Sequence, residues 1–166
     1  MDNQWDVSAK IETTIREINS KITLGMRSRA FSAANELRNA SQLVLRGQRS
    51  GRRYRVPGTH RRQRDKTDGK MKNGRYYTAS APGEPPAVRT GAFRMGWQPE
   101  TKTLHRGQDV TIRAYIQNDV RTDNGKYLLG SILEEGSSRM APRPHHEEIK
   151  KRALPRVVRI YRKPYL

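Results

Sequence analysis

Apolar residues near the amino-terminal end of the chain recur with the period of a helix. Four isoleucines are spaced by four, three and four residues and share one helical stripe: Ile11, Ile15, Ile18 and Ile22. Small apolar residues continue this spacing beyond Gly25, which is a candidate break or kink. We therefore predict one long helix, or two helices in series, over residues 7–45. The isoleucine stripe would pack either on the chain's own sheet or on another subunit.

A pattern with a period of two follows in the second half of the chain. Apolar and polar residues alternate from Asp109 to Gln117, which predicts a half-buried antiparallel strand. Val88 to Trp97 is a second strand candidate. The turn signal Asp123-Asn124-Gly125 precedes residues 126–133, which resume as a strand or a short helix. Residues 108–141 are thus expected to form a small antiparallel sheet.

The carboxyl-terminal part, residues 144–166, is expected to be a basic helix or arm. Acidic residues suit the first turn of a helix over residues 145–154, and basic residues suit a later turn. Pro155 would kink or restart it. The predicted fold class is α+β, with the long N-terminal helix packed on the small sheet. One domain over residues 1–166 would also carry an extended basic loop and a proline-rich arm.

Residues 46–79 show neither period and are rich in arginine, glycine and lysine, so we expect a long loop or a ribbon. The chain has a net charge of +18, and residues 46–75 alone hold twelve basic side chains against two acidic ones. Tyrosines interleave with this charge, a composition suited to phosphate contacts with occasional stacking. A contact with an acidic protein surface and a merely solvated loop are the alternatives. The arginines assigned to DNA or to an acidic partner are Arg52, Arg53, Arg55, Arg61, Arg62 and Arg64.

Residues 80–98 begin with a proline-rich segment whose backbone has few options. Pro82-Gly83 favours a tight turn, and Pro85-Pro86 pushes the chain toward polyproline II. A rigid extended segment of this kind suits an arm that contacts another subunit. The candidate subunit contacts are Pro82, Glu84, Pro85, Pro86 and Arg89.

Catalytic and metal-binding patterns are weak. The chain has no cysteine, which excludes disulfides and thiolate metal sites. The cluster His145-His146-Glu147-Glu148 holds possible metal ligands, but neighbours on a helix point about 100° apart and do not easily converge. Neither a nucleophile elbow nor a phosphate-binding loop is present. We expect no enzyme activity, no cofactor and no metal.

Four pieces of the sequence carry a resemblance to a known family. The most specific is Ser80–Phe93; the others are Ala34–Arg38, Tyr54–Thr59 and Leu133–Pro144, in the same order. Together they span about two thirds of the chain and resemble tailed-bacteriophage neck, head–tail joining or tail-completion proteins. Residues 60–77 look like an insertion relative to that family, so their role is not implied by the resemblance.

The resemblance implies a structural virion protein. We expect a homo-oligomeric ring of six or twelve copies that joins the capsid and portal to the tail around the packaged double-stranded DNA. The partners would be the chain itself, neighbouring portal or adaptor proteins and tail proteins, with no membrane. The protein would be made in the host bacterial cytoplasm. A tail-terminator ring, or a stand-alone protein that binds nucleic acid without sequence specificity, is the alternative.

Overall fold

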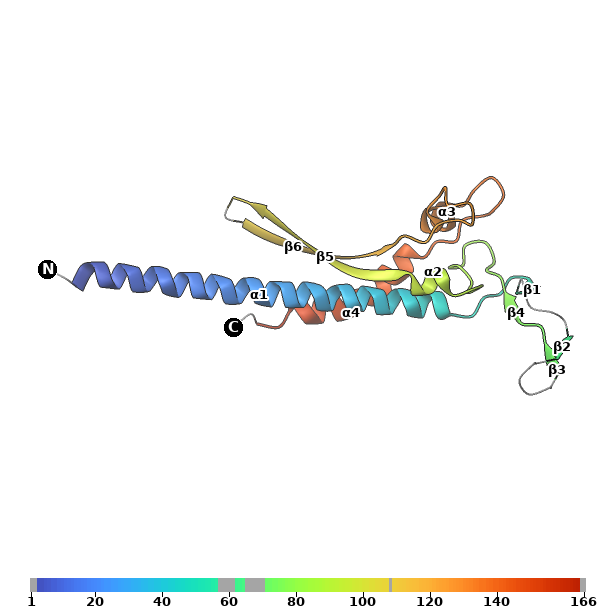
Figure 1. Cartoon of the computed structure of the whole chain (residues 1–166), viewed down its shortest axis with the longest axis horizontal. Coiled ribbons are helices and arrows are strands. Elements are labelled where there is room, and N and C mark those ends of the chain that lie inside the picture. Colours follow the sequence, from blue (N-terminus) through green and yellow to red (C-terminus); the bar gives the residue numbers. More distant parts are fainter. Residues whose placement is uncertain (1–2, 57–61, 65–70, 108, 165–166) are drawn as a thin grey trace.

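A single long helix forms the spine of the molecule (Figure 1). The computed structural model describes residues 3–56, 62–64, 71–107 and 109–164. The helices are α1 (Asn3–Arg46), α2 (Ala92–Met95), α3 (Leu129–Glu135) and α4 (His146–Tyr161). The strands are β1 (Arg53–Arg55), β2 (Arg62–Arg64), β3 (Met71–Asn73), β4 (Tyr76–Thr78), β5 (Trp97–Arg106) and β6 (Asp109–Asn118). The fold class is α+β, as predicted, and α1 is continuous through Gly25.

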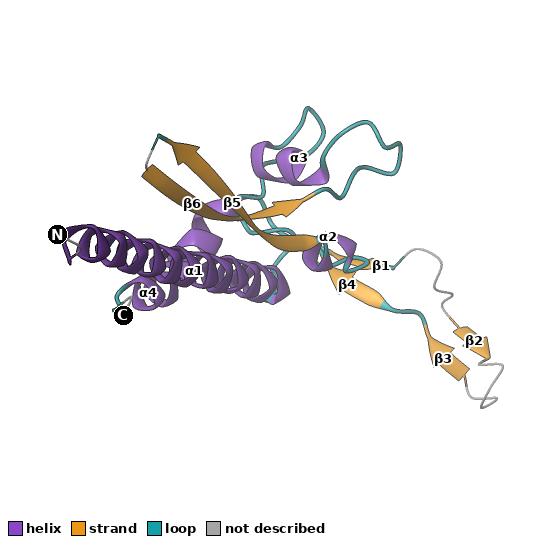
Figure 2. Cartoon of the chain, turned by 60° about the vertical axis from the view of Figure 1, so that its left-hand side comes forward, coloured by secondary structure: helices purple, strands orange, loops and turns teal. Residues whose placement is uncertain are grey.

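The carboxyl-terminal half of α1 holds the core. Its buried face consists largely of small residues, which let other elements approach closely: Ala30, Ala33, Ala34, Ala40 and Ser41. Helix α4 packs on one side of this face and the β5–β6 pair on another (Figures 1 and 2). The central cluster joins the three elements through Leu45, Trp97, Ile149 and Ala153. The core is small for the length of the chain.

The strand predicted from alternation exists as β6, and its partner is β5. The two pair antiparallel from Trp97 opposite Asn118 to Arg106 opposite Asp109. The predicted strand over Val88–Trp97 is wrong, because only its last residue belongs to a strand. Gly91 takes a φ of 91°, and the Thr90 hydroxyl accepts a hydrogen bond from the Ala92 amide at 3.3 Å. These features turn the chain into α2, and β5 starts after it.

The remaining predicted elements are close to those found. Asp123-Asn124-Gly125 forms a turn, with the Gly125 amide bonded to the Thr122 carbonyl at 2.7 Å, and the segment after it becomes the helix α3. Helix α4 continues through Pro155 to Tyr161, so the proline does not end it. Arg156 of α4 forms an ion pair with Glu36 of α1 at 3.2 Å, which ties the two helices together.

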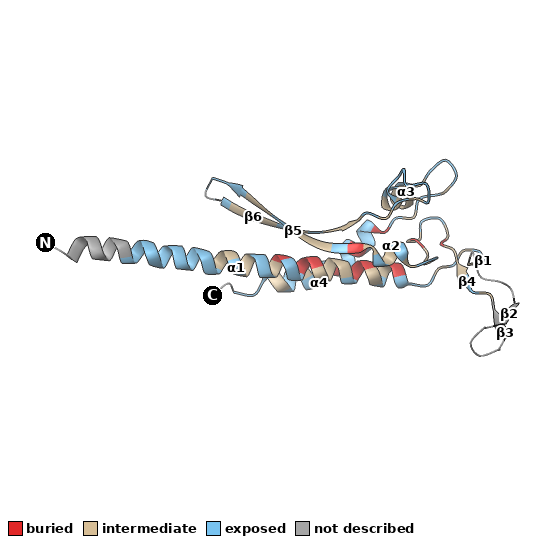
Figure 3. Ribbon diagram, viewed as in Figure 1, coloured by how far each residue is buried: buried red, intermediate tan, exposed pale blue. Residues whose placement is uncertain are grey.

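The amino-terminal end of α1 extends beyond the other elements (Figure 3). The interpretation that the isoleucine stripe packs on the chain's own sheet is therefore wrong for its first three members. Ile11, Ile15 and Ile18 are 55%, 52% and 40% exposed. Helix α4 and the β5–β6 pair instead cover α1 further along, where the buried alanines lie.

Candidate nucleic-acid interface

The basic segment folds into an antiparallel ribbon that leaves the carboxyl-terminal end of α1 (Figures 1 and 2). Strand β1 pairs with β4, and β2 pairs with β3. Backbone hydrogen bonds extend the first ladder from the Gly51 amide to the Ala79 carbonyl and from the Val56 amide to the Arg75 carbonyl, at 3.0 and 2.8 Å. The sequence predicted either a long loop or a ribbon, and the described residues form a ribbon.

Both faces of the β1–β4 ladder carry arginine and tyrosine side chains. The guanidinium of Arg53 lies 4.9 Å from the centre of the Tyr76 ring, on the face that also carries Arg55. On the other face, the guanidinium of Arg52 lies 5.7 Å from the Tyr54 ring. Both contacts are within the range of a cation–π interaction. The ribbon thus holds its cations and aromatic rings together on a two-stranded scaffold.

The ribbon's tyrosines also contact one another across the ladder. Tyr54 lies directly opposite Tyr77, and their rings are stacked with centroids 6.0 Å apart. The sequence showed tyrosines among the basic residues but not this pairing, because the register depends on how the ribbon folds back. The pairing fixes one aromatic face beside Arg52.

The six predicted arginines fall into two groups. Arg52, Arg53 and Arg55 are exposed, and no carboxylate in the described part of the chain pairs with them. Arg62 and Arg64 belong to β2, where their backbones lie opposite Asn73 and Met71. Arg61 lies outside the described residues. The first three therefore present positive charge to solvent that no described carboxylate neutralises.

The base of the ribbon is fixed by the carboxylate of Glu84. It accepts hydrogen bonds from the Ser50 hydroxyl at 2.6 Å, the Ala81 amide at 2.8 Å and the Ser50 amide at 3.1 Å. These bonds, that of the Ser50 hydroxyl foremost, lower the pKa of Glu84 to about 2. Arg49 reinforces the same corner by donating to the carbonyls of Pro86 and Val44. Burial lowers the pKa of Arg49, an effect that the nearby Glu84 opposes.

The proline-rich segment packs on its own domain. Gly83 has a φ of 80°, and the Glu84 amide bonds to the Ala81 carbonyl at 3.1 Å, which gives the predicted turn at Pro82-Gly83. Pro86 is buried and Pro85 is half-buried. Of the residues predicted to contact another subunit, Pro82 and Arg89 are exposed and Glu84 is engaged within the chain. The subunit contact itself stays a prediction.

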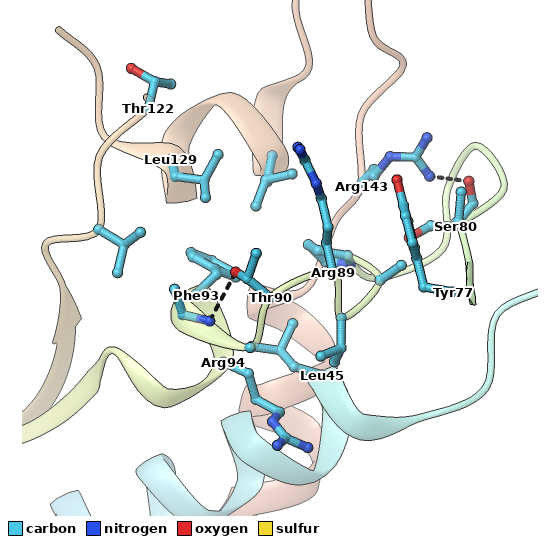
Figure 4. Close-up of a pocket in the computed structure, with 18 of the residues that line it drawn as sticks. Leu45, Tyr77, Ser80, Arg89, Thr90, Phe93, Arg94, Thr122, Leu129 and Arg143 are labelled. Carbon is cyan, nitrogen blue, oxygen red and sulfur yellow. Dashed lines mark hydrogen bonds between the residues drawn. The ribbon is translucent and has the colours of Figure 1, made fainter. Parts of the chain in front are cut away.

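A pocket of about 550 Å³ lies where the ribbon, the proline-rich segment, α2 and α3 meet (Figure 4). Leu45, Phe93 and Leu129 give it apolar walls, and Arg89 extends between them and Arg143. Arg143 already donates to the Ser80 and Ala81 carbonyls, so it braces the proline-rich turn. Its described lining includes the carboxylate of Asp123.

Glu134, at the end of α3, meets the start of α4. Its carboxylate accepts hydrogen bonds from the His145 amide at 2.9 Å and the His146 amide at 3.4 Å, and its Oε2 lies 2.7 Å from the His145 Nδ1. It thereby caps α4, whose own N-cap side chain makes no capping bond. Burial is the main cause that lowers the pKa of His145, opposed by the Arg143 carbonyl and by Glu134.

This junction also bears on the expectation that the four residues His145-His146-Glu147-Glu148 do not easily converge on one ion. Glu134, His145 and His146 can offer three ligand atoms that lie within 4.8 Å of one another. The four neighbouring residues do not converge, since Glu147 and Glu148 are exposed and outside the group; what the sequence did not indicate is that Glu134 of α3 joins the two histidines. The hydrogen bonds of Glu134 already account for the cluster as a helix cap.

We also looked for membrane-spanning helices and for similar known proteins. No helix among the described residues combines the length and apolar character needed to cross a bilayer. No protein-family model, curated protein or solved structure matches this chain. The resemblance to phage neck proteins therefore stays a prediction.

Proposed function

We propose that this chain is a structural virion protein that binds double-stranded DNA through its basic ribbon, as a subunit of a homo-oligomeric ring in the phage neck. The ring would join the capsid and portal to the tail and surround the DNA channel. The observation that carries the DNA contact is the exposed set Arg52, Arg53 and Arg55, held beside tyrosines on an antiparallel ladder.

The kind of DNA contact follows from the chemistry of these side chains. Unpaired guanidiniums attract phosphate, and phosphate contacts carry no sequence information. A duplex that must pass through a ring needs contacts of this weak, sequence-independent kind.

Support for assembly comes from the distribution of buried and exposed residues. The core is centred on one half of α1, while the ribbon and the amino-terminal half of α1 project from it. Elements that project in this way are typical of chains stabilised by neighbouring copies. The assignment to a phage neck is supported by the family resemblance.

The binding experiment measures fluorescence anisotropy of two labelled 30-base-pair duplexes of unrelated sequence, titrated with the full chain. We expect equal affinities for the two duplexes. We also expect unlabelled duplex to displace the labelled duplex at a lower concentration of phosphate groups than the concentration of carboxylate groups that polyglutamate requires. Preference for one duplex would contradict a conduit role. Preference for polyglutamate would instead favour an acidic protein partner for the ribbon.

The assembly experiment measures the native mass of the particle-extracted protein. A closed ring of six or twelve copies is the expected result. A single copy that still binds both duplexes equally would overturn the ring and favour the stand-alone nucleic-acid-binding alternative. The proteins that co-purify with the ring would distinguish a position in the neck from a tail-terminator position.

A further inference from the structure

The amino-terminal half of α1 carries an apolar surface that nothing in the described chain covers. Ile11, Ile15 and Ile18 line one stripe and are each at least 40% exposed. A shallow hollow beside Ile11 and Ile15 is lined by α1 alone. From here on, the isoleucine stripe means its three exposed members, Ile11, Ile15 and Ile18.

The stripe lies along one edge of the helix face that is buried further along α1. At 100° per residue, Ile11, Ile15 and Ile18 share a direction with Ala33 and Ala40, which are buried. That edge is therefore covered over part of the second half of α1 and bare over the first, while the other buried residues lie further around the helix: Ala30, Ala34, Ser41 and Leu45. Spacings of four and three residues match the seam by which helices pack on one another.

The charge around the stripe suits a second copy of this chain. The surrounding segment, residues 10–24, holds three basic and two acidic side chains and is almost neutral in a chain of net charge +18. The ribbon and the carboxyl-terminal part of the chain hold most of the excess positive charge and would repel their counterparts in a second copy. The stripe is thus a surface on which two copies meet without opposing a strong like charge.

A contact here also keeps the ribbons out of the interface. Helix α1 has 44 residues, a length of about 66 Å, with the stripe near one end and the ribbon beyond the other (Figure 1). That separation exceeds the screening length of about 10 Å at 0.1 M salt. The ribbons stay free to bind a polyanion while copies associate.

We propose that the isoleucine stripe is a docking surface for a second copy of this chain. The inference rests on the proposed homo-oligomeric assembly, for which it names a contact surface, and does not depend on DNA binding. It assigns self-association to one end of α1 and polyanion binding to the segment that follows the other end.

A photo-cross-linking experiment tests this directly, because the chain has no cysteine of its own. The variant Ile15→Cys is labelled with a benzophenone maleimide and irradiated as the full chain. Ser20→Cys is the matched control, since Ser20 is exposed and lies about 180° around the helix from the stripe. We expect a covalent dimer from the Ile15→Cys protein, and the cross-linked peptide identifies the partner surface. Equal or absent dimer from the two proteins would overturn the proposal.

A second variant measures the strength of the contact without a label. Ile11→Ser, Ile15→Ser and Ile18→Ser are combined, and self-association is measured by sedimentation. We expect at least about a hundredfold weaker association, because buried apolar anchors dominate such contacts. Unchanged association with a native circular dichroism spectrum would contradict the inference. Duplex binding by the dispersed variant is expected to survive, which separates this result from a failure of the DNA proposal.

Discussion

The carboxylate of Glu84 accepts a hydrogen bond of 2.6 Å from the hydroxyl of Ser50, across 34 residues of chain. This bond joins the proline-rich turn to the linker between α1 and the ribbon. Together with the bonds that the same carboxylate accepts from two backbone amides, it sets where the ribbon leaves the body. The position of the basic residues thus depends on an acidic residue outside the basic segment.

Replacing Glu84 by Gln is expected to loosen this corner without unfolding the helices. A neutral amide accepts the Ser50 and Ala81 hydrogen bonds more weakly than a carboxylate does. Hydrogen exchange at the amides of Ser50 and Ala81 should accelerate, while amides in the middle of α4 should exchange at the rate of the original protein. Unchanged exchange at both amides would mean that Glu84 does not fix the ribbon.

The pH dependence of the same corner has a definite sign. The pKa of Glu84 falls from about 4.5 to about 2 on folding, so its contribution is fully present above about pH 4.5 and is lost as the pH falls toward 2. The exchange rates of the original protein should approach those of the Glu84→Gln variant within that window. A difference that stays constant down to pH 2 would contradict the assignment.

His145 is expected to make the stability of the fold depend on pH in a range above the one in which Glu84 titrates. Burial lowers its pKa, so the unfolded chain takes up a proton near pH 6.5 before the folded one does. Stability should fall as the pH drops below about 6.5, with a slope of at most about 1.4 kcal/mol per pH unit. Denaturant unfolding of His145→Phe should lack this slope. His146→Asn is the control, because His146 is exposed and should leave the slope in place.

Two leucines two residues apart test where the core lies. Leu45 is 1% exposed and packs in the central cluster, whereas Leu43 is 39% exposed. Leu45→Ala should lower the free energy of unfolding by about 2 to 5 kcal/mol, and Leu43→Ala by less than about 1 kcal/mol. Equal decreases in urea unfolding would show that α1 is covered on both faces.

The sequence predicted those elements whose local pattern is strong. The isoleucine and alanine spacing predicted α1, and the alternation from Val110 to Ile116 predicted β6. It did not predict β5, since Pro99 and the charged residues after it obscure the alternation of that strand. Val88–Trp97 was assigned to a strand because its composition suits one, but the positive φ at Gly91 redirects the chain.

Contacts between distant segments were harder to foresee. Glu134 and His145 come together because α3 ends beside the start of α4, a relation that no spacing in the sequence indicates. The cross-strand pair of Tyr54 and Tyr77 likewise depends on the register of the ribbon. The candidate arginines were identified from composition alone, and their exposure and tyrosine partners required the fold.

The salt dependence of duplex affinity tests the central claim most directly. The variant Arg52→Gln, Arg53→Gln, Arg55→Gln is compared with the original chain and with a charge-matched control. The control, Lys102→Gln, Arg106→Gln, Arg113→Gln, removes three exposed cations from the β5–β6 pair instead. If the ribbon arginines bind phosphates, the slope of log affinity against log salt should fall by roughly 0.9 for each arginine–phosphate pair removed, up to about 2.7, in the ribbon variant only. An equal change in both variants, or none in the ribbon variant, would contradict DNA binding through the ribbon.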